Sequence, residues 1–101
     1  MNKKLVYHNT KSEFIQNILE EGLTAGSFSD KPIKAFGDIW LAIELSDLPS
    51  YNIHEYGKVK AYEPEWVIGE DLQGYPITLS IPAELFYITD SKGKILKRLG
   101  E

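Results

Sequence analysis

The stretch from Leu5 to Leu23 specifies a strand, a helix and the turn that ends the helix. Residues 5–10 are rich in β-branched and aromatic side chains, which is typical of a strand. Thr10 and Glu13 have the spacing of a capping box, which predicts a helix that begins after Thr10 and continues to Glu21. The helix would present one apolar stripe, made of Phe14, Ile15, Ile18 and Leu19. Gly22 can adopt the left-handed conformation that ends a helix and lets Leu23 fold back onto Ile18.

The composition of the chain excludes several classes of protein. With 101 residues, 43% hydrophobic and 26% charged, the chain suits one soluble domain spanning residues 1–101. The net charge of −4 argues against a nucleic-acid binder, and no apolar run approaches the roughly 20 residues of a membrane span. The chain has no cysteine and two histidines, so we expect neither a metal site nor a disulfide. A cytoplasmic location fits this composition.

Short strands and one long loop are expected after the helix. Residues 24–38 are small and polar with a proline, which predicts a loop, and residues 39–43 predict a strand. The clearest alternation of apolar and polar residues lies at 77–81, and weaker strand patterns lie at 59–62, 85–88 and 94–99. We therefore predict an α+β domain, with one main N-terminal helix packed on a bent, mostly antiparallel and split sheet.

Two motifs together resemble the ADP-ribosyltransferase superfamily, which includes diphtheria-toxin-like and RNA 2′-phosphotransferase branches. The first is Tyr7-His8-Asn9-Thr10, which is similar to the Tyr-His-Gly-Thr strand of that family. The second is Ile18-Leu19-Glu20-Glu21-Gly22-Leu23, which matches an Ile-Leu, two residues, Gly-Leu pattern. The strand at 39–42 and the later run Pro82-Ala83-Glu84 follow in the same order as in the family.

The resemblance implies an ADP-ribosyltransferase-like split sheet that holds NAD as substrate. His8 would donate a hydrogen bond to a ribose hydroxyl of NAD, and Tyr51 or Tyr56 would stack on nicotinamide. A glutamate on a later strand would stabilise the ribosyl cation, and Glu84 stands nearest to that position. The implied catalytic residues are His8, Tyr56 and Glu84. The implied ligand-binding residues are His8, Asn9, Thr10 and Tyr51.

Three functional hypotheses stay open at this point. The chain can be an NAD-dependent ADP-ribosyltransferase that modifies a macromolecule, or a binder of an ADP-ribose-type nucleotide that lacks the catalytic acid. Asn9 replaces a residue that is commonly small in the family, and no late glutamate is evident. The third hypothesis is an inactive interaction module, for example a phage or mobile-element protein that blocks a host protein. Its contact surface would be acidic and aromatic, with Tyr56, Tyr62, Trp66, Glu55, Glu63, Glu65, Glu70 and Asp71. His8 can also be a purely structural histidine at a strand end.

Overall fold

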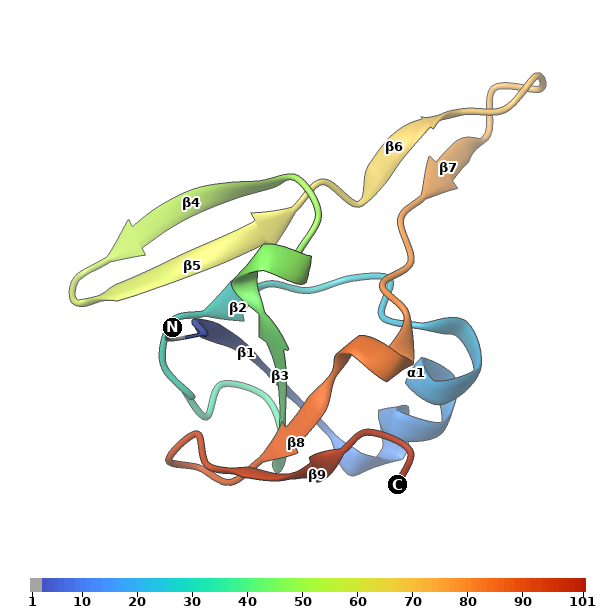
Figure 1. Cartoon of the computed structure of the whole chain (residues 1–101). Coiled ribbons are helices and arrows are strands. Elements are labelled where there is room, and N and C mark those ends of the chain that lie inside the picture. Colours follow the sequence, from blue (N-terminus) through green and yellow to red (C-terminus); the bar gives the residue numbers. More distant parts are fainter. Residues whose placement is uncertain (1–2) are drawn as a thin grey trace.

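The computed structural model describes residues 3–101 and contains one seven-stranded sheet, one two-stranded sheet and one N-terminal helix (Figure 1). The large sheet has the order β4-β5-β2-β1-β3-β8-β9, and each of its pairings is antiparallel. The strands are β1 (Leu5–Thr10), β2 (Phe28–Ser29), β3 (Ile39–Glu44), β4 (Tyr51–Tyr56), β5 (Val59–Pro64), β6 (Val67–Glu70), β7 (Pro76–Thr78), β8 (Tyr87–Thr89) and β9 (Ile95–Arg98). The helical elements are η1 (Ser12–Phe14), α1 (Ile15–Glu21), η2 (Leu45–Asp47) and η3 (Ala83–Leu85). The predicted α+β class, with one N-terminal helix and an antiparallel sheet, is confirmed.

The hydrophobic core lies on one face of the central strands β1 and β3. Val6 pairs with Ile43, and both side chains are fully buried on this face. Phe28 of β2 and Phe86 stack with ring centroids 6.2 Å apart. Ile18 of α1 joins the same buried cluster, so the helix covers this face of the sheet. Because side chains alternate along a strand, His8 lies on the same face as Val6, at the border of the core.

The start of the helix differs from the predicted capping box. Thr10 is the last residue of β1 and is buried, and Lys11 takes the N-cap position without a side-chain hydrogen bond. The cap comes instead from the loop before β3, where Asp38 Oδ1 accepts the N–H of Ser12 at 3.1 Å. A capping box is a local pattern, whereas this cap joins residues 26 positions apart, so the sequence around Thr10 does not reveal it.

Several strands differ from the sequence-based prediction. The loop predicted at 24–38 contains the short strand β2, and the polar-aromatic residues 51–56 form β4, which was not predicted. The clearest predicted strand, 77–81, does not form one continuous strand. Its first part belongs to the exposed β6–β7 hairpin, and Ile81 at its end pairs with Leu23 beside α1. The alternation at 77–81 is a real strand signal, but it does not show that the strand joins the main sheet.

Gly22 ends α1 as predicted and brings the helix end against the chain that follows β7. Its φ of +81° and ψ of 177° differ from the left-handed helical conformation expected from the sequence, and lie in a region that glycine adopts almost exclusively. Leu23 and Ile81 exchange two backbone hydrogen bonds of 2.9 Å, and the Ser80 hydroxyl donates to the carbonyl of Glu21. A Cβ atom at position 22 would meet the Ile81 carbonyl oxygen at 2.7 Å. The backbone conformation and the crowding therefore both require glycine here.

We expect Gly22→Ala to lower the free energy of unfolding by about 1–3 kcal/mol, because alanine is strained at this φ and ψ and clashes with Ile81. The control is Gly57→Ala in the β4–β5 turn, where φ is +63° but no atom lies within 4 Å of the added Cβ. Its loss should be nearer to about 1 kcal/mol, from backbone strain alone. Urea unfolding measures both variants, and equal losses would contradict the packing argument.

Candidate functional site

A pocket of about 870 Å³ opens where the pairing between β1 and β2 stops. Tyr7 and Ser29 form the one register pair between these strands, whereas β1 pairs with β3 along all six of its residues. The pocket is lined by the second half of β1, by α1, by the segments 22–29 and 33–36, and by the β4–β5 hairpin. Its volume is within the range of small-molecule sites.

The backbone of Asn9 faces this opening. The backbone N–H of Leu45, just after β3, donates to the carbonyl oxygen of Lys4, just before β1. Because hydrogen-bonded residues alternate along an antiparallel pair, the even-numbered residues of β1 direct their N–H and C=O groups toward β3. Tyr7 turns toward β2, and Asn9, two residues later, turns the same way without a strand partner in residues 3–101. One donor and one acceptor of the main chain are therefore directed at the pocket.

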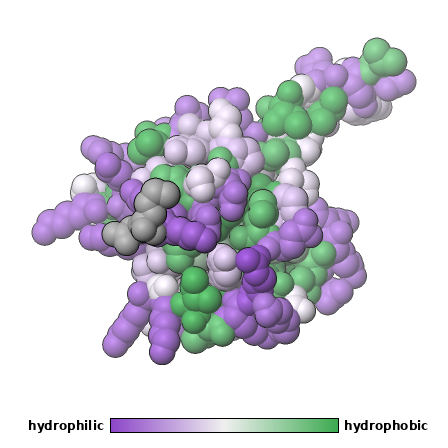
Figure 2. Space-filling model, in the orientation of Figure 1, coloured by the Kyte–Doolittle hydropathy of each residue, from purple (hydrophilic) through white to green (hydrophobic). Residues whose placement is uncertain are grey.

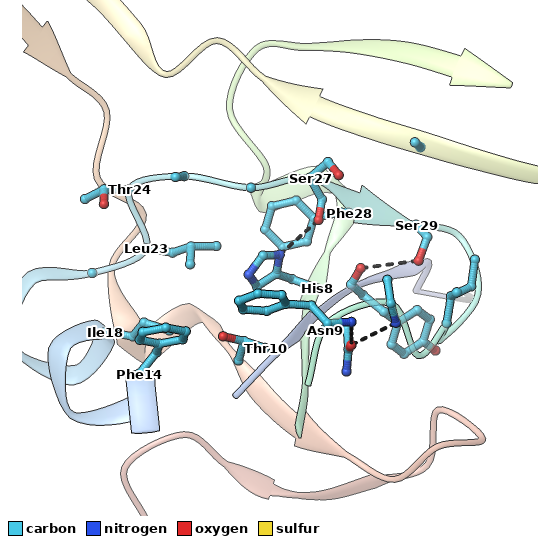
Figure 3. Close-up of a pocket in the computed structure, with 18 of the residues that line it drawn as sticks. His8, Asn9, Thr10, Phe14, Ile18, Leu23, Thr24, Ser27, Phe28 and Ser29 are labelled. Atoms are coloured by element: carbon cyan, nitrogen blue, oxygen red, sulfur yellow. Dashed lines mark hydrogen bonds between the residues drawn. The ribbon is translucent and has the colours of Figure 1, made fainter. Parts of the chain in front are cut away.

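His8 offers a hydrogen-bond acceptor to the pocket. Its Nδ1 lies 3.0 Å from the carbonyl oxygen of Ser27, so Nδ1–H donates and Nε2 keeps its lone pair. Figure 3 shows Nε2 directed into the pocket on the side of Leu23. Burial lowers the pKa of His8 from its usual 6.5 and outweighs the hydrogen bond to Ser27, which acts to raise the pKa. The ring is therefore neutral at pH 7.

Gly26 and Phe28 hold the His8 ring in place. The ring centroids of His8 and Phe28 are 5.6 Å apart, and a Cβ atom at position 26 would lie 2.4 Å from His8 Cε1. The carbonyl oxygen of Gly26 accepts a hydrogen bond of 2.8 Å from Trp66 Nε1, at the base of the β6–β7 hairpin. Trp66 thus fixes the segment that covers His8.

Thr10 adds a second polar group without a protein partner. The residue is 3% exposed, and its hydroxyl has no hydrogen-bond partner among the described residues 3–101. Figure 3 shows this oxygen facing the same space as the free nitrogen of His8, between Phe14 and the imidazole. No fully buried side-chain N or O atom among residues 3–101 lacks a hydrogen-bond partner, so the Thr10 hydroxyl oxygen is open to the pocket, where a water or a ligand group can bind it. The pair of His8 Nε2 and Thr10 Oγ1 therefore marks where a polar ligand group fits.

Aromatic rings form the mouth of the pocket, and positive charge stays outside it. Phe14 and Phe36 stack with centroids 6.0 Å apart and an interplanar angle of 3°, and Lys11 Nζ lies 4.9 Å from the centre of the Phe36 ring. Among residues 3–101, no Lys or Arg lines the pocket, and Glu21 is the one carboxylate that does. The interior therefore suits a neutral or cationic flat group better than a phosphate.

The side chain of Asn9 is occupied by the protein itself. Its Oδ1 accepts the backbone N–H groups of Ala35, Phe36 and Gly37 at 3.0, 2.7 and 2.7 Å. Its Nδ2 donates to the carbonyls of Gly37 and Ile39 at 3.0 and 3.1 Å. This set of bonds, called the Asn9 clasp below, shapes the loop that carries Phe36. It leaves the backbone of Asn9, rather than its amide, available to a ligand.

The structure brings together some of the site residues expected from the sequence. His8, Asn9, Thr10 and Tyr56 all line the pocket. Tyr51 lies outside it and packs edge-on against Tyr62, with centroids 5.3 Å apart. Glu84 also lies outside, in η3, where its carbonyl oxygen accepts a bond of 2.7 Å from Arg98.

Phe14, Glu21, Gly26 and Phe36 also line the pocket, although no motif in the sequence marks them as site residues. The apolar stripe of the helix contained Phe14, but nothing in the sequence indicated its contact with Phe36. Among residues 3–101, no group of three or more His, Asp or Glu residues is placed to hold a metal ion. No helix in this part of the chain is both long and apolar enough to cross a membrane. The chain matches no protein-family model, no curated protein and no solved structure.

We expect His8 to make the protein less stable in acid. Its pKa is lower in the folded state than the unfolded value of 6.5, so the unfolded state binds the proton more readily. The stabilisation is complete above about pH 6.5 and is lost as the pH falls toward the folded pKa. Urea unfolding of wild type and His8→Gln between about pH 5 and pH 8 measures this, and the loss should shrink in the variant. Identical pH profiles would contradict a neutral, buried His8.

We expect Trp66→Phe to loosen the cover over His8. The substitution keeps an aromatic ring at the base of the hairpin and removes the Nε1–H that binds Gly26 O, at a loss of about 1 kcal/mol of stability. Amide hydrogen exchange in residues 24–27 should accelerate. The matched control is Trp40→Phe, which removes the 3.1 Å bond from Trp40 Nε1 to Ile33 O elsewhere in the chain. Unchanged exchange at 24–27 in Trp66→Phe would contradict this role.

Proposed function

We propose that the pocket binds the nicotinamide–ribose end of NAD, or the corresponding end of an ADP-ribose-type nucleotide. The observation that carries this proposal is the pair of unpartnered groups, His8 Nε2 and Thr10 Oγ1, which face one space at the opening of the sheet. Two neighbouring hydroxyls of a ribose match such a pair, because a hydroxyl both donates and accepts. The resemblance of Tyr7-His8-Asn9-Thr10 to the ADP-ribosyltransferase strand supports the same assignment.

The direction of the His8 hydrogen bond differs from the one that the resemblance implies. A neutral imidazole whose Nδ1–H is bound to Ser27 O can only accept at Nε2. In the proposed complex, His8 therefore accepts a hydrogen bond from a ribose hydroxyl. Thr10 Oγ1 can donate to the neighbouring oxygen. The backbone N–H and C=O of Asn9 can pair with a carboxamide, which presents the complementary acceptor and donor.

The charges of the pocket support nicotinamide, rather than pyrophosphate, in the interior. The nicotinamide ring of oxidised NAD carries a positive charge, and the lining provides aromatic rings and the carboxylate of Glu21. The negative pyrophosphate would lie at the mouth, where Lys11 sits over Phe36. Of the two tyrosines that the resemblance implies, Tyr51 and Tyr56, it is Tyr56 that lines the pocket, and it would contact the ligand ring.

Transfer of ADP-ribose on this site needs a carboxylate near the ribose. In that reaction the bond from C1′ to the nicotinamide nitrogen breaks, nicotinamide leaves with the electron pair, and an acceptor oxygen or nitrogen attacks C1′ and loses its proton. Glu84 lies outside the pocket, so Glu21 is the acid that the lining offers for stabilising the ribosyl cation. Nicotinamide release by wild type and by Glu21→Gln separates a transferase from a binder.

We expect NAD to raise the melting temperature and to bind measurably by calorimetry, with ADP-ribose and nicotinamide as partial ligands. Thr10→Val and His8→Ala each remove one hydrogen bond to the ribose, so each should raise the dissociation constant about tenfold. Thr10→Val is nearly isosteric and deletes a hydroxyl without a protein partner, so its stability should stay close to that of the wild type. Tyr51→Phe, outside the pocket, is the control and should bind as the wild type does.

The absence of binding for NAD, ADP-ribose and nicotinamide to the folded wild type would refute the proposal. Binding that survives Thr10→Val and His8→Ala unchanged would also refute it, because the ligand would then lie elsewhere. A loss of binding in His8→Ala that only parallels a loss of folding would leave Thr10→Val as the deciding variant.

A further inference from the structure

The β6–β7 hairpin, residues 65–79, projects from the body of the protein as an arm (Figure 1). Several of its side chains are apolar yet exposed. Val67, Ile68 and Tyr75 are each more than half exposed, and Leu72 at the turn is wholly exposed. Figure 2 shows hydrophobic residues at the base and at the tip of the arm, with hydrophilic residues between them. An isolated two-stranded hairpin is marginally stable in water, and such apolar exposure is typical of a contact surface.

The arm is acidic, and its negative charge limits the kind of surface that can bind to it. Between Ala61 and Ser91 the sequence contains no Lys, Arg or His, while Glu65, Glu70 and Asp71 lie on or beside the arm. An arm that paired with an identical arm would bring these carboxylates together, which is unfavourable. The complementary surface must therefore be both apolar and basic.

The last strand of the large sheet is such a surface. β9 has β8 on one side, and on its other side no strand of residues 3–101 pairs with it. Ile95 and Leu96 are about half exposed, and Lys94 and Lys97 are exposed beside them. Lysines on an edge strand oppose pairing between two identical edges, but they attract an acidic strand. β6 and β9 also have the same length of four residues.

We propose that the arm of one chain docks on the free β9 edge of a second copy of this chain. Figure 1 places the arm and β9 at opposite ends of the molecule. Two copies side by side and antiparallel, related by a two-fold axis, therefore make the contact twice, with each arm on the other copy's β9. The arm adds strands to the sheet edge, the apolar side chains of both elements are covered, and the acids of the arm lie near the lysines of β9. This dimer does not depend on the nucleotide proposal.

The test is the mass of the full chain in solution, measured by sedimentation and by light scattering from micromolar to near-millimolar concentration. Wild type should pass from monomer to dimer, and high salt should weaken the dimer. Glu65→Lys with Glu70→Lys reverses the arm, and Lys94→Glu with Lys97→Glu reverses the edge. Each double variant alone should raise the dissociation constant about tenfold or more. Asp71 is left unchanged, because its Oδ1 accepts the N–H groups of Gln73 and Tyr75 and forms the turn.

An equimolar mixture of the two double variants should restore the dimer, because the reversed arm meets the reversed edge and the two unchanged surfaces meet each other. Glu20→Lys, on the exposed side of α1, is the charge control and should dimerise as the wild type does. A wild type that stays monomeric at every concentration overturns the proposal and assigns the arm to a partner of another sequence. Double variants that dimerise like wild type, or a mixture that stays monomeric although both variants are folded, also overturn it.

Discussion

Strand β1 makes unequal pairings on its two edges, and the rest of the structure depends on this inequality. All six of its residues pair with β3, whereas one residue pairs with β2. The β3 side builds the core, because it aligns Val6 with Ile43 and His8 with Leu41 on the covered face. The other side leaves the end of β1 open, and the pocket occupies that opening. A complete ladder between β1 and β2 would continue the sheet and close the site.

Two sets of hydrogen bonds hold the walls of the pocket in place. The Asn9 clasp satisfies three backbone N–H groups of the loop 35–37 and holds Phe36 against Phe14 at the mouth. On the opposite side, Trp66 binds Gly26 O, and Leu23 pairs with Ile81, so the wall over His8 is anchored to both ends of the arm. The pocket wall and the arm therefore share their supports, although the arm itself points away from the pocket.

The expectations that rested on local pattern agree best with the structure. β1, the helix up to Glu21, its termination at Gly22 and the strand after residue 38 all follow from side chains close together in sequence. The capping box fails because Thr10 is drawn into the strand and Asp38 supplies the cap from a distance. β4 was missed because its residues are polar and mostly exposed on both faces, so they carry no alternating pattern. At the site, the motif around His8 indicated three pocket residues, His8, Asn9 and Thr10. It did not indicate Phe36, Gly26 or Trp66, whose roles depend on contacts between distant segments.

The sequence by itself determined the strand–helix unit of residues 5–23 and the position of His8 and Thr10 at its junction, because propensity, periodicity and the glycine stop act over a few residues. It also determined the separation of charge, with no cation from Ala61 to Ser91 and lysines around β9. Only the tertiary structure decided where the sheet opens and which ring nitrogen of His8 carries the proton. It also decided that the Asn9 side chain binds the backbone of the loop 35–37, and that the alternating segment near Ile77 becomes part of an exposed arm. These features arise from hydrogen bonds and packing between segments tens of residues apart, which no local pattern encodes.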